Sequence, residues 1–209
     1  MSKPIFHDSL RSSAAWRVRA ALAIKGIDAE TRRYEIIGKP HRTPEFMALN
    51  PQGTVPVLQI DGQTIPQSLA IIEYLDETQP GPRLLPQDPS ERARVRVLSH
   101  IIAMETHVVT NMDVARDVAG ADDAQLIAWQ HRYFKRGFDA LEVYLEQPAT
   151  GVFCHGDNLS MADCCLVPQV RNAERAELDL SQWPKIAAIY ARCLAEPAFE
   201  QTNPDRLAT

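Results

Sequence analysis

Two consecutive serines near the N-terminus are the residues best placed to do chemistry. Ser12 and Ser13 follow a short apolar run over 4–6, which predicts a buried strand, and they precede apolar residues at helical spacing. We therefore predict that the serines begin a helix. A helix start has unpaired N–H groups and the positive end of the helix dipole. Hydroxyls there can hold an anion such as a thiolate, although an isolated pair of serines is more often an ordinary helix cap.

A second polar pair precedes another apolar helix. Gln67 and Ser68 stand before the run over 69–75. Ser68 is predicted to cap that helix, and its hydroxyl and N–H are suited to bind a carboxylate. The alternative is a cap without a ligand.

A proline at the head of a predicted strand is the third candidate. Pro56 follows Val55, and a proline there fits a strand start, a sheet edge or a cis turn. A cis bond would leave the Val55 backbone exposed as a two-point clamp for a peptide-like ligand. The alternative is a strand-edge proline, because an X-Pro bond favours trans.

A fourth motif belongs to folding. Ser160 and Asp163 have the spacing of a capping box, in which each side chain bonds the other residue's backbone N–H. We expect no catalytic role for it.

Composition narrows the class of protein. The 209 residues are 45% hydrophobic and carry a net charge of -5, which predicts a globular chain whose partner is neither nucleic acid nor a membrane. No run is long enough to span a bilayer, and the N-terminus lacks a signal-peptide core. The four cysteines show no zinc-site spacing, so we expect no metal, reduced buried thiols and a cytoplasmic location. They are Cys154, Cys164, Cys165 and Cys193.

The order of elements predicts two domains. A domain over 1–79 alternates strands and helices as βαβαββα, and a proline-rich linker over 80–89 leads to an all-helical domain over 90–209. The strands are expected over 4–7, 29–37, 55–60 and 64–65, and the first three helices over 12–25, from 43 to 50, and over 69–76. Helices of the second domain are expected over 90–118, 123–146, 160–176 and 184–194.

These motifs together resemble a known family. The runs over 12–19, 48–51, 67–75 and 161–163 stand in the order found in zeta-class glutathione transferases. So do Val55-Pro56 and the runs over 84–86, 166–170 and 172–175. Within that class, the chain most resembles the maleylacetoacetate and maleylpyruvate isomerases, over nearly its whole length.

The resemblance implies a thioredoxin-like domain that binds glutathione and a helical domain that forms the second-substrate wall. Ser12 would donate to the glutathione sulfur, with Ser13 beside it. Val55, with Pro56 cis, would clamp the cysteinyl backbone. The γ-glutamyl end would be held by Gln67 and Ser68.

Four further residues come from the resemblance alone. His41 stands where the family often has a glutamine near the glycyl end of glutathione. A His-Pro-Leu-Asn-Asn-like stretch is reduced here to the run from His107 to Asn111, and we expect these two residues in the glutathione site. Arg11 and Arg175 match arginines that face the carboxylates of a diacid, which would bring the two domains together around the substrate.

Two departures bear on the activity. Ala14 stands where the family usually has a cysteine, and Leu10 replaces an aromatic residue. The first disfavours reactions that need a protein thiol, and the second changes the pocket wall.

The leading hypothesis is a glutathione-dependent cis–trans isomerase of a maleyl-type diacid in aromatic catabolism, acting as a homodimer. The thiolate would add to the cis double bond, the bond would rotate, and the thiolate would leave. Two alternatives remain: conjugation or dehalogenation of small haloacids, and a glutathione-binding protein without catalysis.

Overall fold

A computed structural model describes residues 3–120 and 122–208 of the chain. Its contacts divide the chain into two units. The first contains the residues up to Leu85 together with those from Glu196 onward, and the second runs from Pro86 to Ala195. The sequence predicted a single domain over 90–209, whereas the final residues group with the N-terminal unit. The reason lies in buried contacts of Thr202 that are described below.

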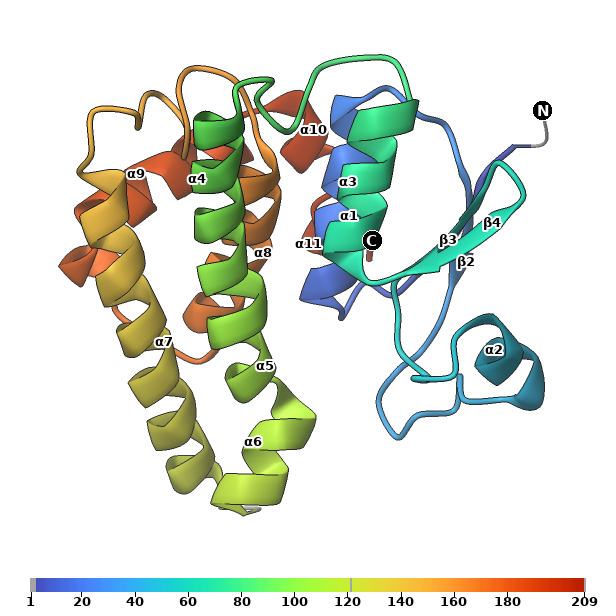
Figure 1. Ribbon diagram of the computed structural model, residues 1–209. Helices are drawn as coiled ribbons and strands as arrows, with labels where there is room; N and C mark the ends of the chain where they lie inside the picture. The colour runs from blue at the N-terminus through green and yellow to red at the C-terminus, as the bar shows by residue number, and fades with distance from the viewer. Residues whose placement is uncertain (1–2, 121, 209) are drawn as a thin grey trace. The chain divides into compact units, whose positions relative to one another are not determined.

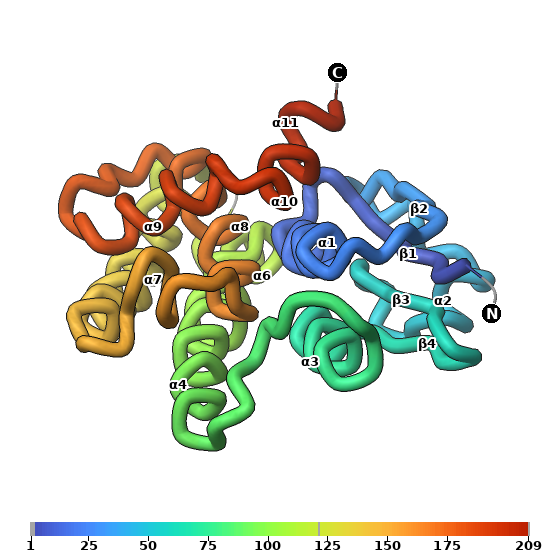
Figure 2. The backbone as a smooth tube through the Cα atoms, turned by 90° about the horizontal axis from the view of Figure 1, so that it is seen from above, coloured from blue at the N-terminus to red at the C-terminus, as the bar shows by residue number. Residues whose placement is uncertain are grey.

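The first unit is built on a four-stranded mixed sheet (Figure 1). The strand order is β2-β1-β3-β4, with β1 parallel to β2 and antiparallel to β3, and with β3 antiparallel to β4. Helices α1 and α3 lie on one side of the sheet and α2 on the other (Figure 2). The predicted order βαβαββα is confirmed. The elements are β1 (Ile5–Asp8), α1 (Ser13–Ile24), β2 (Glu30–Arg33), α2 (Pro44–Leu49), β3 (Val57–Ile60), β4 (Gln63–Pro66) and α3 (Ser68–Thr78).

Strand β2 is shorter than the predicted strand over 29–37. Its partner β1 ends at Asp8, which pairs with Arg33, so the ladder has no further partner beyond that point. Tyr34 and Ile36 instead pack against a small core under α2 that contains Phe46. The end of the predicted strand, beyond Arg33, therefore partly buries these two side chains without strand pairing.

The second unit is helical. The predicted helices over 123–146, 160–176 and 184–194 are confirmed to within a residue at each end. The elements are α4 (Pro89–His100), the π-helix η1 (Ile101–Thr106), α5 (His107–Thr110), α6 (Met112–Ala119), α7 (Asp123–Leu145), α8 (Met161–Arg175), the 3-10 helix η2 (Leu180–Gln182) and α9 (Pro184–Leu194). The first unit ends with α10 (Pro197–Glu200) and α11 (Pro204–Leu207).

The prediction of one continuous helix over 90–118 was wrong. Its middle turns form the wider π-helix η1, at the end of which Thr106 Oγ1 donates to the Ile101 carbonyl at 2.8 Å. Gly137 of α7 lies so close to Thr106 that a Cβ there would collide with its hydroxyl. At Asn111 the backbone turns to ψ 135 and ends the helical run.

Two expectations about the second unit hold. The capping box of Ser160 and Asp163 is formed at the start of α8. The four cysteines are free and buried, and burial raises the pKa of Cys154 and Cys164 far above that of an ordinary thiol. Among the described residues, no helix combines the length and the apolar character needed to cross a membrane.

Candidate functional site

The start of α1 presents a hydroxyl whose hydrogen is available to a ligand. Ser12 is the N-cap, with extended backbone, and its Oγ accepts a hydrogen bond from Ala15 N at 3.1 Å. A hydroxyl has one hydrogen and two lone pairs, so accepting from Ala15 leaves its hydrogen free to donate. Ser13 is the first residue of the helix and is buried. The predicted helix start is confirmed, and it has the properties of an anion site.

Arg11 lies beside this helix start on an exposed turn. Its guanidinium Nε is 3.7 Å from a carboxylate oxygen of Glu35, and both side chains are about half exposed. Hydrogen bonds from the N–H groups of Ile37 and Ile36 hold the pKa of Glu35 below its ordinary value. An exposed ion pair of this length contributes little to stability, so Arg11 can leave Glu35 for a stronger anionic partner.

The start of α3 differs from the prediction. The N-cap is Gln67, and Ser68 is the first helical residue, so the prediction that Ser68 caps the helix was wrong. Its hydroxyl instead accepts from Nη1 of buried Arg17, on α1, at 3.3 Å. Arginine has only donors, so the Ser68 hydrogen also stays available. Gln67 has φ 72, which is uncommon for a residue with a side chain and often marks a functional turn.

The loop before β3 ties the remaining residues of the first unit together. The Val55–Pro56 bond is cis, as the resemblance implied. His41 Nε2 bonds the carbonyl oxygen of Gly53 at 3.0 Å, and Gln67 Nε2 donates to Gln52 Oε1 at 2.6 Å.

His41 also has a polar atom to satisfy. Its Nδ1 is buried and has no hydrogen-bond partner among the described residues. Such an atom costs free energy until a donor or acceptor reaches it.

The other three predicted residues belong to the second unit. His107 begins α5 and is half-buried, and Arg175 ends α8 with an exposed side chain. Asn111 caps α6 by accepting from Asp113 N at 3.0 Å. The roles of these residues toward glutathione or a diacid remain predictions.

Comparison with known proteins shows the family. Residues 11–78 match the model of the glutathione S-transferase N-terminal domain, and residues 87–192 match that of the C-terminal domain. The chain belongs to the glutathione S-transferase family. It is 48% identical to a maleylacetoacetate isomerase of Rhizobium meliloti strain 1021, with 98% of each chain covered.

Solved structures place this glutathione S-transferase in the zeta class. A maleylpyruvate isomerase described as a bacterial zeta-class enzyme is 39% identical, with a TM-score of 0.91 and 96% of each chain covered. A maleylacetoacetate isomerase of Methylobacterium extorquens AM1 with bound malonate and GSH is 35% identical, with a TM-score of 0.91 and 97% of each chain covered.

Sequence reasoning missed the arginines that support the serines of this glutathione S-transferase. Arg17 bonds Ser68, and Arg19 pairs with buried Asp8 at 2.8 Å. Both arginines interrupt the apolar face of a helix that is otherwise buried, and this pattern is the signal that could have found them. Gln52 had no comparable signal, because its role depends on the fold of the loop.

Proposed function

We propose that this chain is a glutathione-dependent cis–trans isomerase of a maleyl-type diacid, with maleylacetoacetate and maleylpyruvate as the two candidate substrates. The observation that carries the proposal is the Ser12 hydroxyl, which caps α1 through a lone pair and keeps its hydrogen for an anion. Relatives named as isomerases of these two compounds support the choice of substrate.

The residues present fit glutathione. The tripeptide has a thiol, two carboxylates and backbone amides, and the first unit offers a partner for each class of group. Ser12 suits the sulfur, Ser68 suits the γ-glutamyl carboxylate, and the Val55 backbone suits the cysteinyl amide. The buried Nδ1 of His41 lacks a partner among the described residues, as a subsite for the glycyl end would.

When bound, glutathione supplies a thiolate that adds to the cis double bond and leaves after rotation, so it is regenerated. A free thiol has a pKa of about 8.5 and is mostly protonated at neutral pH. A hydrogen bond from the Ser12 hydroxyl and the dipole of α1 both favour the charged form and lower that pKa. Ser13, the next residue, contributes to the same helix start.

We assign the two arginines to the diacid. Guanidinium groups bind carboxylates through two parallel hydrogen bonds, and they stabilise negative charge that develops on the conjugated carbonyl. Arg11 is held only by an exposed contact with Glu35, which a carboxylate ligand can replace. Arg175 is proposed to contribute to the diacid site from the helical unit, in which His107 and Asn111 are proposed to contact glutathione.

We further propose that the protein acts as a homodimer in the cytoplasm. The family resemblance supports the dimer, which sedimentation would test. Four buried thiols without a disulfide suit a reducing compartment.

A spectrophotometric assay tests the proposal. Maleylpyruvate and maleylacetoacetate are supplied with and without glutathione, and isomerisation of one of them only in the presence of glutathione is the expected result. Turnover of a small haloacid without isomerisation would instead favour the transferase alternative. Binding of glutathione without either activity would favour a binding protein.

Arg175→Ala sharpens the assay. We expect it to raise KM for the diacid at least tenfold and to leave conjugation of a neutral electrophile nearly unchanged. Equal loss of both activities would mean that Arg175 is structural.

A further inference from the structure

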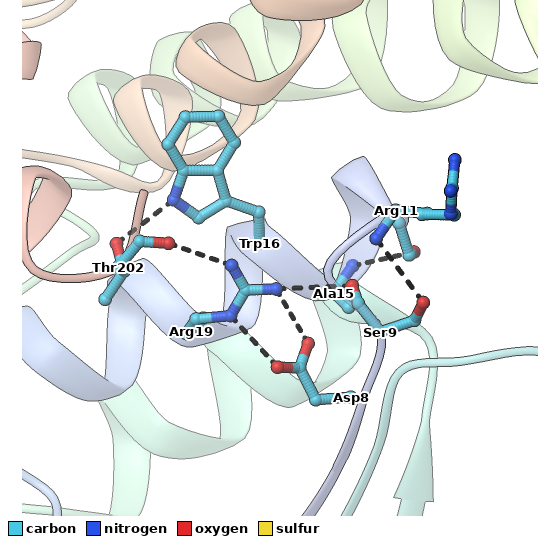
Figure 3. Close-up of polar contacts among 8 residues, drawn as sticks. Asp8, Ser9, Arg11, Ala15, Trp16, Arg19 and Thr202 are labelled. Carbon is cyan, nitrogen blue, oxygen red and sulfur yellow. Dashed lines mark hydrogen bonds and ion pairs between the residues drawn. The ribbon is translucent and has the colours of Figure 1, made fainter. Parts of the chain in front are cut away.

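A buried polar cluster joins the C-terminal segment to the turn that carries Ser12 (Figure 3). We propose that Arg19 is a positioning residue for Ser12, and that Thr202 of the C-terminal segment holds Arg19 in place. The inference rests on the proposed role of Ser12 toward a thiolate. In this proposal, Arg19 of α1 and the C-terminal segment that contains Thr202 both help to position Ser12.

The centre of the cluster is an ion pair that is almost fully buried. Arg19 donates to the two carboxylate oxygens of Asp8, from Nε at 3.1 Å and from Nη2 at 2.8 Å. The exposed fraction is 8% for Arg19 and 0% for Asp8. Two parallel bonds fix the plane of the guanidinium, so its remaining hydrogens point in set directions.

One of those directions leads to Ser12. Nη2 of Arg19 also donates to the carbonyl oxygen of Ser9 at 3.2 Å. The same carbonyl accepts from the backbone N–H of Ser12 at 3.1 Å. Arg19 and the Ser12 backbone therefore share one acceptor, and displacement of that carbonyl moves the residue whose hydroxyl caps α1.

The side chain of Ser9 gives the turn one further described bond, which is long. Ser9 is buried, and its hydroxyl accepts from the backbone of Arg11 at 3.4 Å, close to the limit of a hydrogen bond. A hydrogen bond from a charged donor is about twice as strong as one between neutral groups. The Arg19 contact is thus the strongest restraint that the described contacts place on the Ser9 carbonyl.

The other direction leads to the chain's end. Nη1 of Arg19 donates to the carbonyl oxygen of Thr202 at 2.8 Å, and Trp16 Nε1 donates to Thr202 Oγ1 at 3.0 Å. Thr202 Oγ1 in turn donates to the Ala198 carbonyl at 2.7 Å, which ties it to α10. The C-terminal segment therefore covers the far side of the guanidinium. These contacts to α1 explain why the residues from Glu196 onward group with the first unit.

The test is a pair of double variants, each of which removes both partners of one buried ion pair; the control also removes the contact of Asp76 with the half-exposed Arg83. Asp8→Asn with Arg19→Gln neutralises both charges, so that no buried charge is left alone, and shortens the side chain that reaches Ser9. Lys25→Met with Asp76→Asn is the matched control. That pair is equally buried in the same unit, with 3.8 Å between Nζ and Oδ1, and no described contact joins it to the turn over 9–12.

The readout is the pKa of the thiol of bound glutathione, followed by thiolate absorbance against pH. We expect the Asp8–Arg19 double variant to raise this pKa by about 0.5–1 and to lower kcat three- to tenfold, with a smaller change in glutathione affinity. The control should lose stability and leave the pKa unchanged. An unchanged pKa in the first variant, or equal rises in both, would overturn the proposal.

Two further arms keep the test decisive. If the double variant does not fold, Arg19→Lys replaces it, because lysine keeps the charge beside Asp8 but cannot reach Ser9 and Thr202 at the same time. The same direction of change is expected, and an unchanged pKa would again overturn the proposal. Ser12→Ala distinguishes the role of Ser12 toward the thiolate from the positioning role of Arg19. If it shifts the pKa of the bound thiol and the Arg19 variants do not, only the positioning role fails. If Ser12→Ala has no effect, the proposed role of Ser12 fails.

Discussion

Helices α1 and α8 both have a serine as N-cap, and the two serines differ in how the hydroxyl hydrogen is used. Ser12 Oγ accepts from Ala15 N, which leaves its hydrogen available. Ser160 Oγ donates to Asp163 Oδ2 at 2.7 Å, so its hydrogen is used within the fold. Ser160 and its partner Asp163 are both buried, whereas Ser12 is half-buried. Helix capping is common to both, but only the first helix start can offer a donor to an anion.

Ser68, at the start of α3, resembles Ser12 in its hydrogen bonding. Its hydroxyl accepts from Arg17, a residue of another helix, and is likewise left with a hydrogen to donate. The two proposed ligand sites therefore share one device: a donor inside the protein occupies a lone pair of the serine. At α8 the Asp163 carboxylate accepts the hydrogen of Ser160, so none is left for a ligand.

The largest effect is expected from Asp163→Ala. The Asp163 carboxylate accepts from Ser160 N at 2.8 Å and from Cys154 N at 2.9 Å, as well as from the Ser160 hydroxyl. Removing it leaves these donors buried without a partner, which should lower the free energy of unfolding by about 2–4 kcal/mol. Denaturant titration measures this, with Asp163→Asn as the milder control. A loss no greater than that of Ser12→Ala would break the contrast between the helix starts.

Ser12→Ala should act on activity more than on stability. It removes the donor to the thiolate, so we expect kcat to fall about tenfold to a hundredfold and the pKa of the bound thiol to rise. The lost cap should cost only about 1 kcal/mol of stability. Ser13→Ala is the matched control, and a larger effect on thiolate absorbance from Ser13 would mean that the neighbouring serine binds the sulfur.

Ser68→Ala should weaken glutathione binding about tenfold, because one donor to the γ-glutamyl carboxylate is lost. Calorimetry measures the affinity. A glutathione analogue without the γ-glutamyl carboxylate is the control ligand, and its affinity should be the same for both proteins. Unchanged affinity for glutathione itself would remove Ser68 from the site.

The smallest effect concerns a histidine whose two nitrogens are both used in the fold. His7 Nδ1 is 2.9 Å from Tyr34 Oη, and Nε2 is 3.0 Å from Gln59 Oε1. Burial lowers the pKa of His7 below its ordinary value of 6.5.

The sign of the pH dependence follows. The unfolded chain takes up a proton at His7 before the folded chain does as pH falls. The free energy of unfolding should therefore decrease from about pH 6.5 downward, until the folded pKa is reached. Denaturant titrations across this range should show a smaller slope for His7→Asn, with exposed His100→Gln as the control. An equal slope in the wild type and in His7→Asn would contradict the assignment.

Local patterns predicted the helix starts well, because a cap depends on residues that are close in the chain. The start of α1 at Ser13 and the capping box at Ser160 both followed from short-range spacing. The prediction for Ser68 failed because its cap does not depend on local spacing alone. Gln67 is the N-cap and has a left-handed backbone, which depends on the loop before β3 and not on the helix. The close approach of α7 to Thr106 was missed because it depends on Gly137, which is distant in sequence.

The sequence by itself determined the order of elements, the family and which serines stand at helix starts. Only the tertiary structure decided what each serine can do, because the direction of a hydroxyl depends on the partner that packs against it. Arg17 comes to Ser68 from 51 positions away, and Thr202 comes to Arg19 from 183 positions away. Contacts over such separations depend on how helices and the chain's end pack together, and no spacing within a motif records them.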